Sequence, residues 1–274
     1  MERFSRRCLH HLPLLLTLLL AAAALLYGPI AQLENYHAFA DQLTLLGIPH
    51  ALDVLSNLGF ALVALWGLWR LLPARRSAEL AAGWPGYALF LGGLLLTALG
   101  SSWYHLAPDD HRLVWDRLPI ALASAGLLAG VWGDCRQRRS AGFAAGLGLA
   151  AIFGVLWWYV GALQGGGDLR PYLLLQVLTM LLIPLWQWLY RRPRAERLAF
   201  GAALGLYALA KVAELLDHPL AALLDPLTGH SLKHLLSGAA TAVVVVWLAR
   251  RSRAATLAAD TAPVAPSPTG THLH

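Results

Sequence analysis

The chain has 274 residues, of which 58% are hydrophobic and only 13% are charged, and its formal net charge is +6. This composition is too apolar for an ordinary soluble domain of that length. The positive charge does not indicate a nucleic-acid partner, because the arginines gather in particular loops between apolar runs.

Apolar runs of about 20 residues recur along the chain, and each is long enough to cross roughly 30 Å of hydrocarbon as a helix. They predict spans at residues 12–31, 52–72, 84–105, 114–133, 141–162, 171–190, 197–217 and 229–249. We therefore expect an all-α polytopic membrane protein with three parts. These are a basic segment with an extra transmembrane helix at 1–33, a seven-helix core at 34–251, and a disordered cytoplasmic tail at 252–274.

The first apolar run has an alternative interpretation as a signal peptide, since two arginines precede it. The run is long for a signal peptide and lacks a clear polar region before a cleavage site, which favours a retained helix. Cleavage would leave seven spans in the same orientation.

Charge alternates between successive loops. Arginines precede the first span and follow the second, fourth, sixth and eighth. The intervening loops are mainly acidic and contain Glu34, Asp41, Asp109, Asp110, Asp168, Asp217 and Asp225. By the positive-inside rule, both termini are predicted to be cytoplasmic and the acidic loops to face outward. The arginine-rich inner loops favour a bacterial inner membrane. Cys8 and Cys135 both fall on the inner side, so no disulfide is expected.

Polar residues inside the predicted spans gather at one depth. Ser101 and His105 lie at the outer end of the third span, four residues apart, and so share a helix face. Asp116 opens the fourth span, and His230 and His234 open the eighth with the same spacing. Ionisable residues are costly inside a membrane and indicate a functional site. Three helices are thus predicted to bring these groups together near the outer, periplasmic side.

Three histidines beside a carboxylate are the donor set of a catalytic zinc site. Zinc accepts neutral imidazole and is held tetrahedrally, so three protein ligands leave a fourth position for water. The predicted ligands are His105, His230 and His234. We expect Asp116 to accept the proton of the water and Ser101 to donate to the developing oxyanion.

Each of these residues also has a simpler interpretation. Ser101 can be a helix-packing residue, Asp116 a helix cap, and an HxxxH pair can bond to neighbouring helices or hold haem. The shared depth favours the metal site. Haem fits less well, because its axial pair faces across from two helices, whereas His230 and His234 share one face. Lys211 and Glu214, three residues apart, either form an ion pair or line the cavity.

The order and spacing of these residues resemble the alkaline ceramidase family, within a wider group of seven-helix membrane hydrolases that includes adiponectin-receptor-like proteins. The matching stretches are SSWYH, then DRLP, then HSLKH in the last span, and the family's Ser-Asn pair is matched by Ser56 and Asn57. The resemblance covers residues 34–249. It implies that the three histidines hold zinc and that Asp116 and Ser101 act on water. The implied substrate is a ceramide-type N-acyl lipid, cleaved to a fatty acid and a long-chain amine.

The chain departs from this family in its acidic N-terminal calcium site, which is built around Asp-Trp-Cys-Glu-x-Asn-Tyr. Only Glu34, Asn35 and Tyr36 match it, so Ca²⁺ is not a firm expectation, although Asp41 and Asp53 are available to a cation site. Many bacteria lack ceramide, which leaves another lipid amide or ester as an alternative substrate.

Two other classes of protein compete with a hydrolase. One is a receptor-like protein with a structural metal site, which would need neither Asp116 nor Ser101. The other is a transporter in which Lys211, Glu214 and the histidines form a relay, but transporters place such groups at mid-membrane rather than at one face. The sequence does not predict the oligomeric state.

Overall fold

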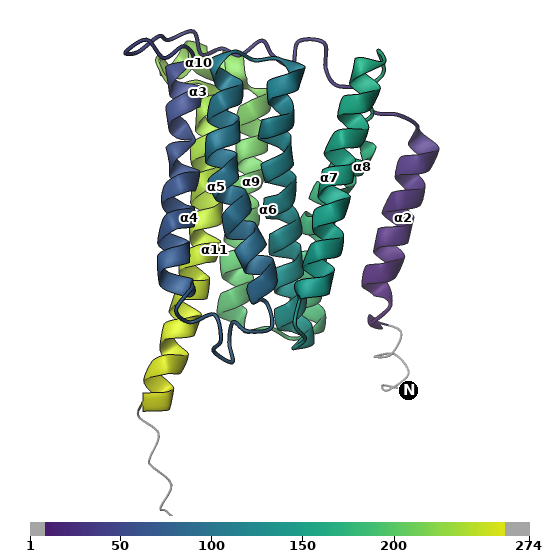
Figure 1. Cartoon of the computed structure of the whole chain (residues 1–274), viewed down its shortest axis with the longest axis vertical. Coiled ribbons are helices and arrows are strands. Elements are labelled where there is room, and N and C mark those ends of the chain that lie inside the picture. The colour runs from purple at the N-terminus through teal and green to yellow at the C-terminus, as the bar shows by residue number, and fades with distance from the viewer. Residues whose placement is uncertain (1–8, 261–274) are drawn as a thin grey trace, which may run out of the picture.

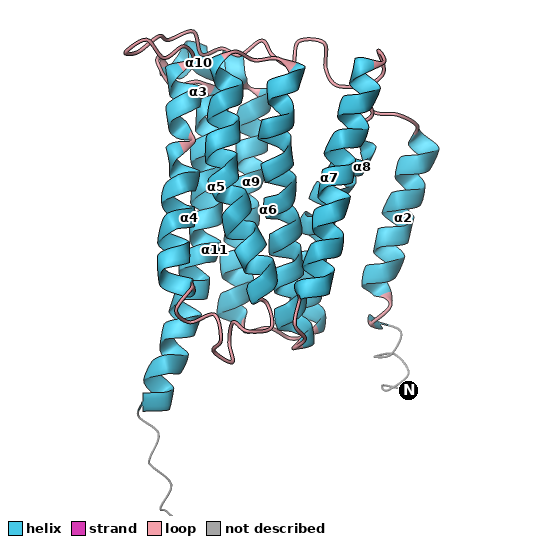
Figure 2. Ribbon diagram, in the orientation of Figure 1, coloured by secondary structure: helices cyan, strands magenta, loops and turns pink. Residues whose placement is uncertain are grey.

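The computed structural model describes residues 9–260, and within that range it contains helices and no strand (Figure 2). The described helices are α2 (Leu12–Tyr27), α3 (Ala51–Ser56), α4 (Leu58–Leu71), α5 (Trp84–Leu106), α6 (Asp110–Arg136), α7 (Ala141–Leu163), α8 (Arg170–Leu189), α9 (Arg194–Leu215), α10 (Asp217–Leu224) and α11 (Gly229–Asp260). Among residues 9–260, seven segments are long and apolar enough to cross a membrane, with α3 and α4 forming one of them. The predicted all-α polytopic fold is confirmed.

The first predicted span is shorter in the structure than expected. The helix α2 ends at Tyr27, where Gly28 adopts a φ of +92°. Its 16 residues extend about 24 Å, less than the roughly 30 Å of a hydrocarbon core. It stands at the edge of the bundle beside α8 (Figure 1). The first of the eight predicted spans is therefore a shorter, peripheral helix.

Asp168, in the loop before α8, ties this N-terminal region to the bundle. Its carboxylate accepts hydrogen bonds from the Ile30 N–H at 3.2 Å and from the Trp157 indole at 3.1 Å. It also pairs with Arg170 at 2.9 Å, and Arg170 in turn donates to the carbonyl of Ala24 in α2 at 3.1 Å. Burial alone would raise the pKa of Asp168, but the hydrogen bonds from Arg170 and Trp157 hold it below its ordinary value.

The last helix is longer than predicted. α11 continues to Asp260, through the first residues of the segment 252–274 that was expected to be disordered. The rest of that segment, 261–274, lies outside the described residues. The two ends of the described chain lie at the same end of the bundle, opposite α3 and α10 (Figure 1).

The helices α5 and α6 approach each other closely through glycine. A Cβ atom at Gly86 would lie 2.1 Å from the backbone nitrogen of Gly130, and one at Gly100 would lie 1.8 Å from the carbonyl oxygen of Trp115. Small residues let the backbones of membrane helices come into contact in this way. The last turn of α5 is thereby held against the first turns of α6.

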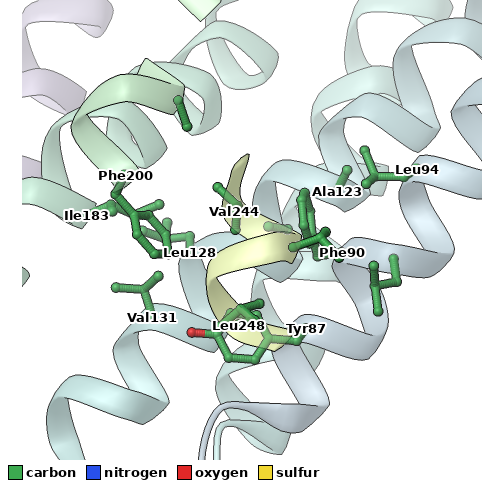
Figure 3. Close-up of a cluster of buried hydrophobic side chains, with 14 of the residues drawn as sticks. Tyr87, Phe90, Leu94, Ala123, Leu128, Val131, Ile183, Phe200, Val244 and Leu248 are labelled. Atoms are coloured by element: carbon green, nitrogen blue, oxygen red, sulfur yellow. The ribbon is translucent and has the colours of Figure 1, made fainter. Parts of the chain in front are cut away.

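Apolar side chains fill the middle of the bundle. Figure 3 shows part of this core, to which α5, α6, α8, α9 and α11 contribute Tyr87, Phe90, Leu94, Ala123, Leu128, Val131, Ile183, Phe200, Val244 and Leu248. These helices are thereby packed into one unit.

A buried polar network closes the end of the bundle opposite α3 and α10. The Asp134 carboxylate accepts a hydrogen bond from the Tyr87 hydroxyl at 2.6 Å and pairs with Arg251 at 2.6 Å. Arg251 also lies 3.6 Å from Glu196, which pairs with Arg192 at 2.8 Å. These residues come from α5, α6, α9, α11 and the turn after α8, so the network joins most of the bundle at that end.

Candidate metal centre

The three predicted histidine ligands come together at the end of the bundle near α3 and α10. His105 lies in the last turn of α5, and His230 and His234 lie in the first turns of α11. All three side chains are buried, with exposures of 1%, 5% and 3%. One ring nitrogen from each lies within 4.8 Å of the others, close enough for a single metal ion to bind all three. That they bind a metal remains a prediction.

The start of α11 is fixed by hydrogen bonds around it. The N–H of His230 donates to the Asp217 carboxylate at 2.7 Å, which satisfies one of the free N–H groups of the first helical turn. Thr228 and Ser231 hydrogen-bond reciprocally through side chain and backbone at 3.0 Å. Because His230 and His234 are one turn apart, fixing this turn aims both rings to the same side.

The helix pair α3 and α4 contacts the other side of the histidine cluster. The Ser56 hydroxyl lies 2.8 Å from Nδ1 of His234, which leaves Nε2 of that ring to a metal ion. Both ring nitrogens of His105 are buried and have no hydrogen-bond partner among the described residues. A buried ring nitrogen without a partner is a costly arrangement that a metal ion would relieve. His105 and His234 therefore fit a metal site.

Lys233 contacts the third histidine, although it is not among the predicted site residues. Its ammonium donates to Nε2 of His230 at 2.9 Å and pairs with Glu214 at 3.0 Å. Glu214 also pairs with Lys211 at 2.6 Å, so one carboxylate bridges two ammonium groups. A metal ion would bind the other ring nitrogen of His230 or displace Lys233. The three-residue spacing of His230 and Lys233 could have indicated this contact, because residues three apart share a helix face.

Asp116 and Ser101 lie together beside the histidines. Both are buried, and the two side chains are close enough for the Ser101 hydroxyl to interact with the Asp116 carboxylate. Both also line the same internal cavity as His234. The two residues predicted to act on water are therefore adjacent to the predicted ligands.

This cavity has a volume of about 440 Å³, within the range of small-molecule pockets. Its walls are mostly apolar and come from α5, α6, α8, α9 and α11. On α8 and α9 the lining includes the exposed residues Trp188, Gly201 and Lys211. The cavity therefore reaches the outside of the bundle between these two helices, at a height where a membrane would surround them.

The loop between α2 and α3 covers two of the three histidines, His105 and His230. The Phe39 ring lies 4.4 Å from the ring of His230 and 4.7 Å from that of His105, measured between centroids. The Ala40 N–H donates to Asp217 at 2.9 Å, which fixes the loop. His37, in the same loop, lies 2.9 Å from the Tyr104 hydroxyl and supports the cover.

The residues that echo a calcium site do not gather into one. Glu34 and Asn35 are exposed, whereas Asp41 and Asp53 are buried. Asp41 accepts a hydrogen bond from the backbone N–H of Asp53 at 2.9 Å. Within residues 9–260, the three histidines form the group with metal-binding geometry.

Comparison of the chain with models of protein families, with curated proteins and with solved structures finds no match. The fold and the site nevertheless define a class. The chain is a multi-pass α-helical membrane protein whose bundle encloses three histidines placed to hold a metal ion.

Proposed function

We propose that this protein is a zinc-dependent membrane hydrolase that cleaves the amide bond of ceramide-type N-acyl lipids, giving a fatty acid and a long-chain amine. The observation that carries the proposal is the position of Asp116 and Ser101. They lie beside a three-histidine group, in a cavity that reaches the bundle surface between two membrane helices. A structural metal site would need neither a buried carboxylate nor a hydroxyl there.

The ligand set supports zinc. Three neutral imidazoles suit Zn²⁺ and leave one coordination position for water or substrate. When bound there, zinc would polarise a carbonyl group and lower the pKa of water towards neutrality.

The chain's own residues supply the proton transfers. Asp116 accepts a proton from water and later gives it to the leaving amine, as a general base and then a general acid. Ser101, whose hydroxyl lies within reach of Asp116, donates to the oxyanion of the substrate. Phe39 covers the histidines, which keeps bulk water from that side of the reaction.

The dimensions of the cavity support a lipid substrate. On α6 its lining runs from Asp116 to Leu127, a rise of about 17 Å. One leaflet of the hydrocarbon core is about 15 Å thick, which is half of the roughly 30 Å bilayer core. An acyl chain entering between α8 and α9 would therefore have an apolar channel of suitable length.

We also propose a bacterial inner membrane as the location, with both termini cytoplasmic and the site towards the periplasm. Arg70, Arg136, Arg192 and Arg251 all lie at or near the helix ends opposite the histidines. The positive-inside rule assigns that end to the cytoplasm.

Metal content and lipid-amide hydrolysis of the detergent-purified protein test the proposal. We expect about one zinc ion per chain, lost in the His230→Ala/His234→Ala double variant. Asp116→Asn should retain zinc but hydrolyse N-acyl lipids about 10²–10⁴-fold more slowly. Retention of full activity by Asp116→Asn would contradict the assigned mechanism, and zinc without any hydrolysis would favour a receptor-like protein.

A transporter is the second candidate, because Lys211, Glu214 and Lys233 form a continuous charged cluster in the cavity wall. Ionisable residues within transmembrane helices form proton relays in membrane transporters. Reconstitution in vesicles separates the two functions, since a transporter moves a solute or protons across the membrane without consuming lipid.

A further inference from the structure

Asp53, in the short helix α3, places a carboxylate next to the ring of His105. The side chain is fully buried, and its Oδ2 atom lies 3.8 Å from Nδ1 of His105. Neither of these two atoms has a hydrogen-bond partner among the described residues. Within residues 9–260, no lysine or arginine forms an ion pair with Asp53. The His105 imidazole, at 3.8 Å, is therefore available to satisfy this carboxylate oxygen.

The surroundings of Asp53 fix its position. Its backbone N–H donates to Asp41 at 2.9 Å, and its carbonyl oxygen accepts from the Asn57 side chain at 2.7 Å. The Thr228 hydroxyl, from the loop before α11, lies 3.4 Å from Oδ1. Thr228 thus faces one carboxylate oxygen, and the other is left for His105.

A distance of 3.8 Å is longer than a hydrogen bond, which needs about 3.2 Å or less. A small rotation of either side chain closes the gap when Nδ1 carries the proton. Histidines that bind metals commonly donate their second ring N–H to a carboxylate, which fixes the tautomer and makes the ligand nitrogen more basic. A divalent cation on the other nitrogen would also offset the cost of burying the carboxylate.

We propose that Asp53 is a positioning residue for the metal centre. It accepts a hydrogen bond from Nδ1–H of His105 and so directs Nε2 of that ring to the metal ion. Ser56, three residues further along the chain, contacts Nδ1 of His234 in the same manner. The break between α3 and α4 therefore orients two of the three ligands. The inference rests on the metal site of the proposed function but not on the reaction.

The test is the Zn²⁺ affinity of the full-length protein in detergent, measured by competition with a metal-binding dye. Asp53→Asn keeps the size of the side chain but removes its charge, and we expect affinity to fall about 10–100-fold. Thr228→Val removes the hydroxyl that faces Oδ1 of Asp53, but it also removes the hydrogen bonds of that hydroxyl with Ser231. Ser231→Ala, which disturbs the Ser231 bonds and leaves the Thr228 hydroxyl beside Asp53, is its control, and we expect Thr228→Val to lose more Zn²⁺ affinity than Ser231→Ala does. The visible spectrum of bound Co²⁺ should also change in Asp53→Asn, because the ligand field at His105 changes.

Asp134→Asn is the matched control, since it removes another buried carboxylate at the far end of the bundle. It should lower Tm while leaving Zn²⁺ affinity unchanged. Equal affinity in Asp53→Asn and wild type would overturn the inference, as would an equal loss in Asp134→Asn. If Asp53→Asn does not fold, the comparison of Thr228→Val with Ser231→Ala decides the question, and equal Zn²⁺ affinities in these two variants would overturn the inference. Weaker zinc binding in a protein that hydrolyses no lipid would refute the proposed reaction and leave this inference standing. Absence of zinc from the wild type would overturn both.

Discussion

Replacing Gly100 by alanine tests whether the contact between α5 and α6 positions the proposed site. The added Cβ would lie 1.8 Å from the carbonyl oxygen of Trp115, whereas real Cβ atoms essentially never approach within 3.0 Å of other heavy atoms. The obstacle is backbone, so no side chain can move aside. The two helices must therefore separate by more than an ångström at this point.

The expected cost follows from two opposing effects. Overpacking of this kind costs about 1–3 kcal/mol, and the better helix propensity of alanine offsets about 1 kcal/mol of it. We expect Gly100→Ala to destabilise the fold by up to about 2 kcal/mol. Because Ser101 and Asp116 are the neighbours of the two clashing residues, their separation should also reduce hydrolysis about 100-fold.

Gly92 provides the matched control on the same helix. A Cβ at Gly92 has no atom within 4 Å among the described residues, so Gly92→Ala should be neutral or stabilise by up to about 1 kcal/mol. Thermal unfolding in detergent and lipid-amide hydrolysis measure both effects. Equal Tm values and activities for the two variants would show that the close contact of α5 and α6 does not hold the site.

Two further predictions concern charges outside the metal centre. Asp134→Asn should lower the free energy of unfolding by about 3 kcal/mol, because it leaves Arg251 buried without its closest partner; a Tm equal to that of wild type would refute this. Asp168→Asn should lower Tm at neutral pH by releasing Arg170 and the N-terminal region. Since folding lowers the pKa of Asp168, its stabilisation is complete above the ordinary value of about 3.9 and is lost as pH falls below that value. Tm curves of variant and wild type should therefore converge in acid, and a constant difference would contradict the assignment.

The parts that were predictable depend on strong local constraints. A membrane core sets the length of each span, which is why seven of the predicted spans recur in the structure within a few residues. Helical periodicity placed His230 and His234 on one face, and the membrane depth placed His105 beside them. The sequence pattern could not predict the residues at which α2 and α11 end, because neither end is set by the thickness of the hydrocarbon core.

Other features depend on contacts between distant segments. Phe39 reaches the histidines because its loop is tied to Asp217, far along the chain. The buried pair of Asp134 and Arg251 has no local sequence signal, because the positive-inside rule counts charges without considering how they pair. Asp53 was considered only for a calcium site, since no local pattern indicates that its carboxylate faces His105.

The Phe39 cover has a practical consequence for inhibition. A charged, water-soluble chelator that approaches from the loop side meets a closed aromatic contact over two of the histidines. A lipid-soluble chelator can instead enter through the membrane, by the opening between α8 and α9. A protein that resists a water-soluble chelator could therefore still contain a metal ion, because the resistance would show only that the chelator cannot reach the site from the loop side. For the proposed zinc hydrolase, the partitioning of a compound into the bilayer should therefore govern its potency as much as its affinity for the metal.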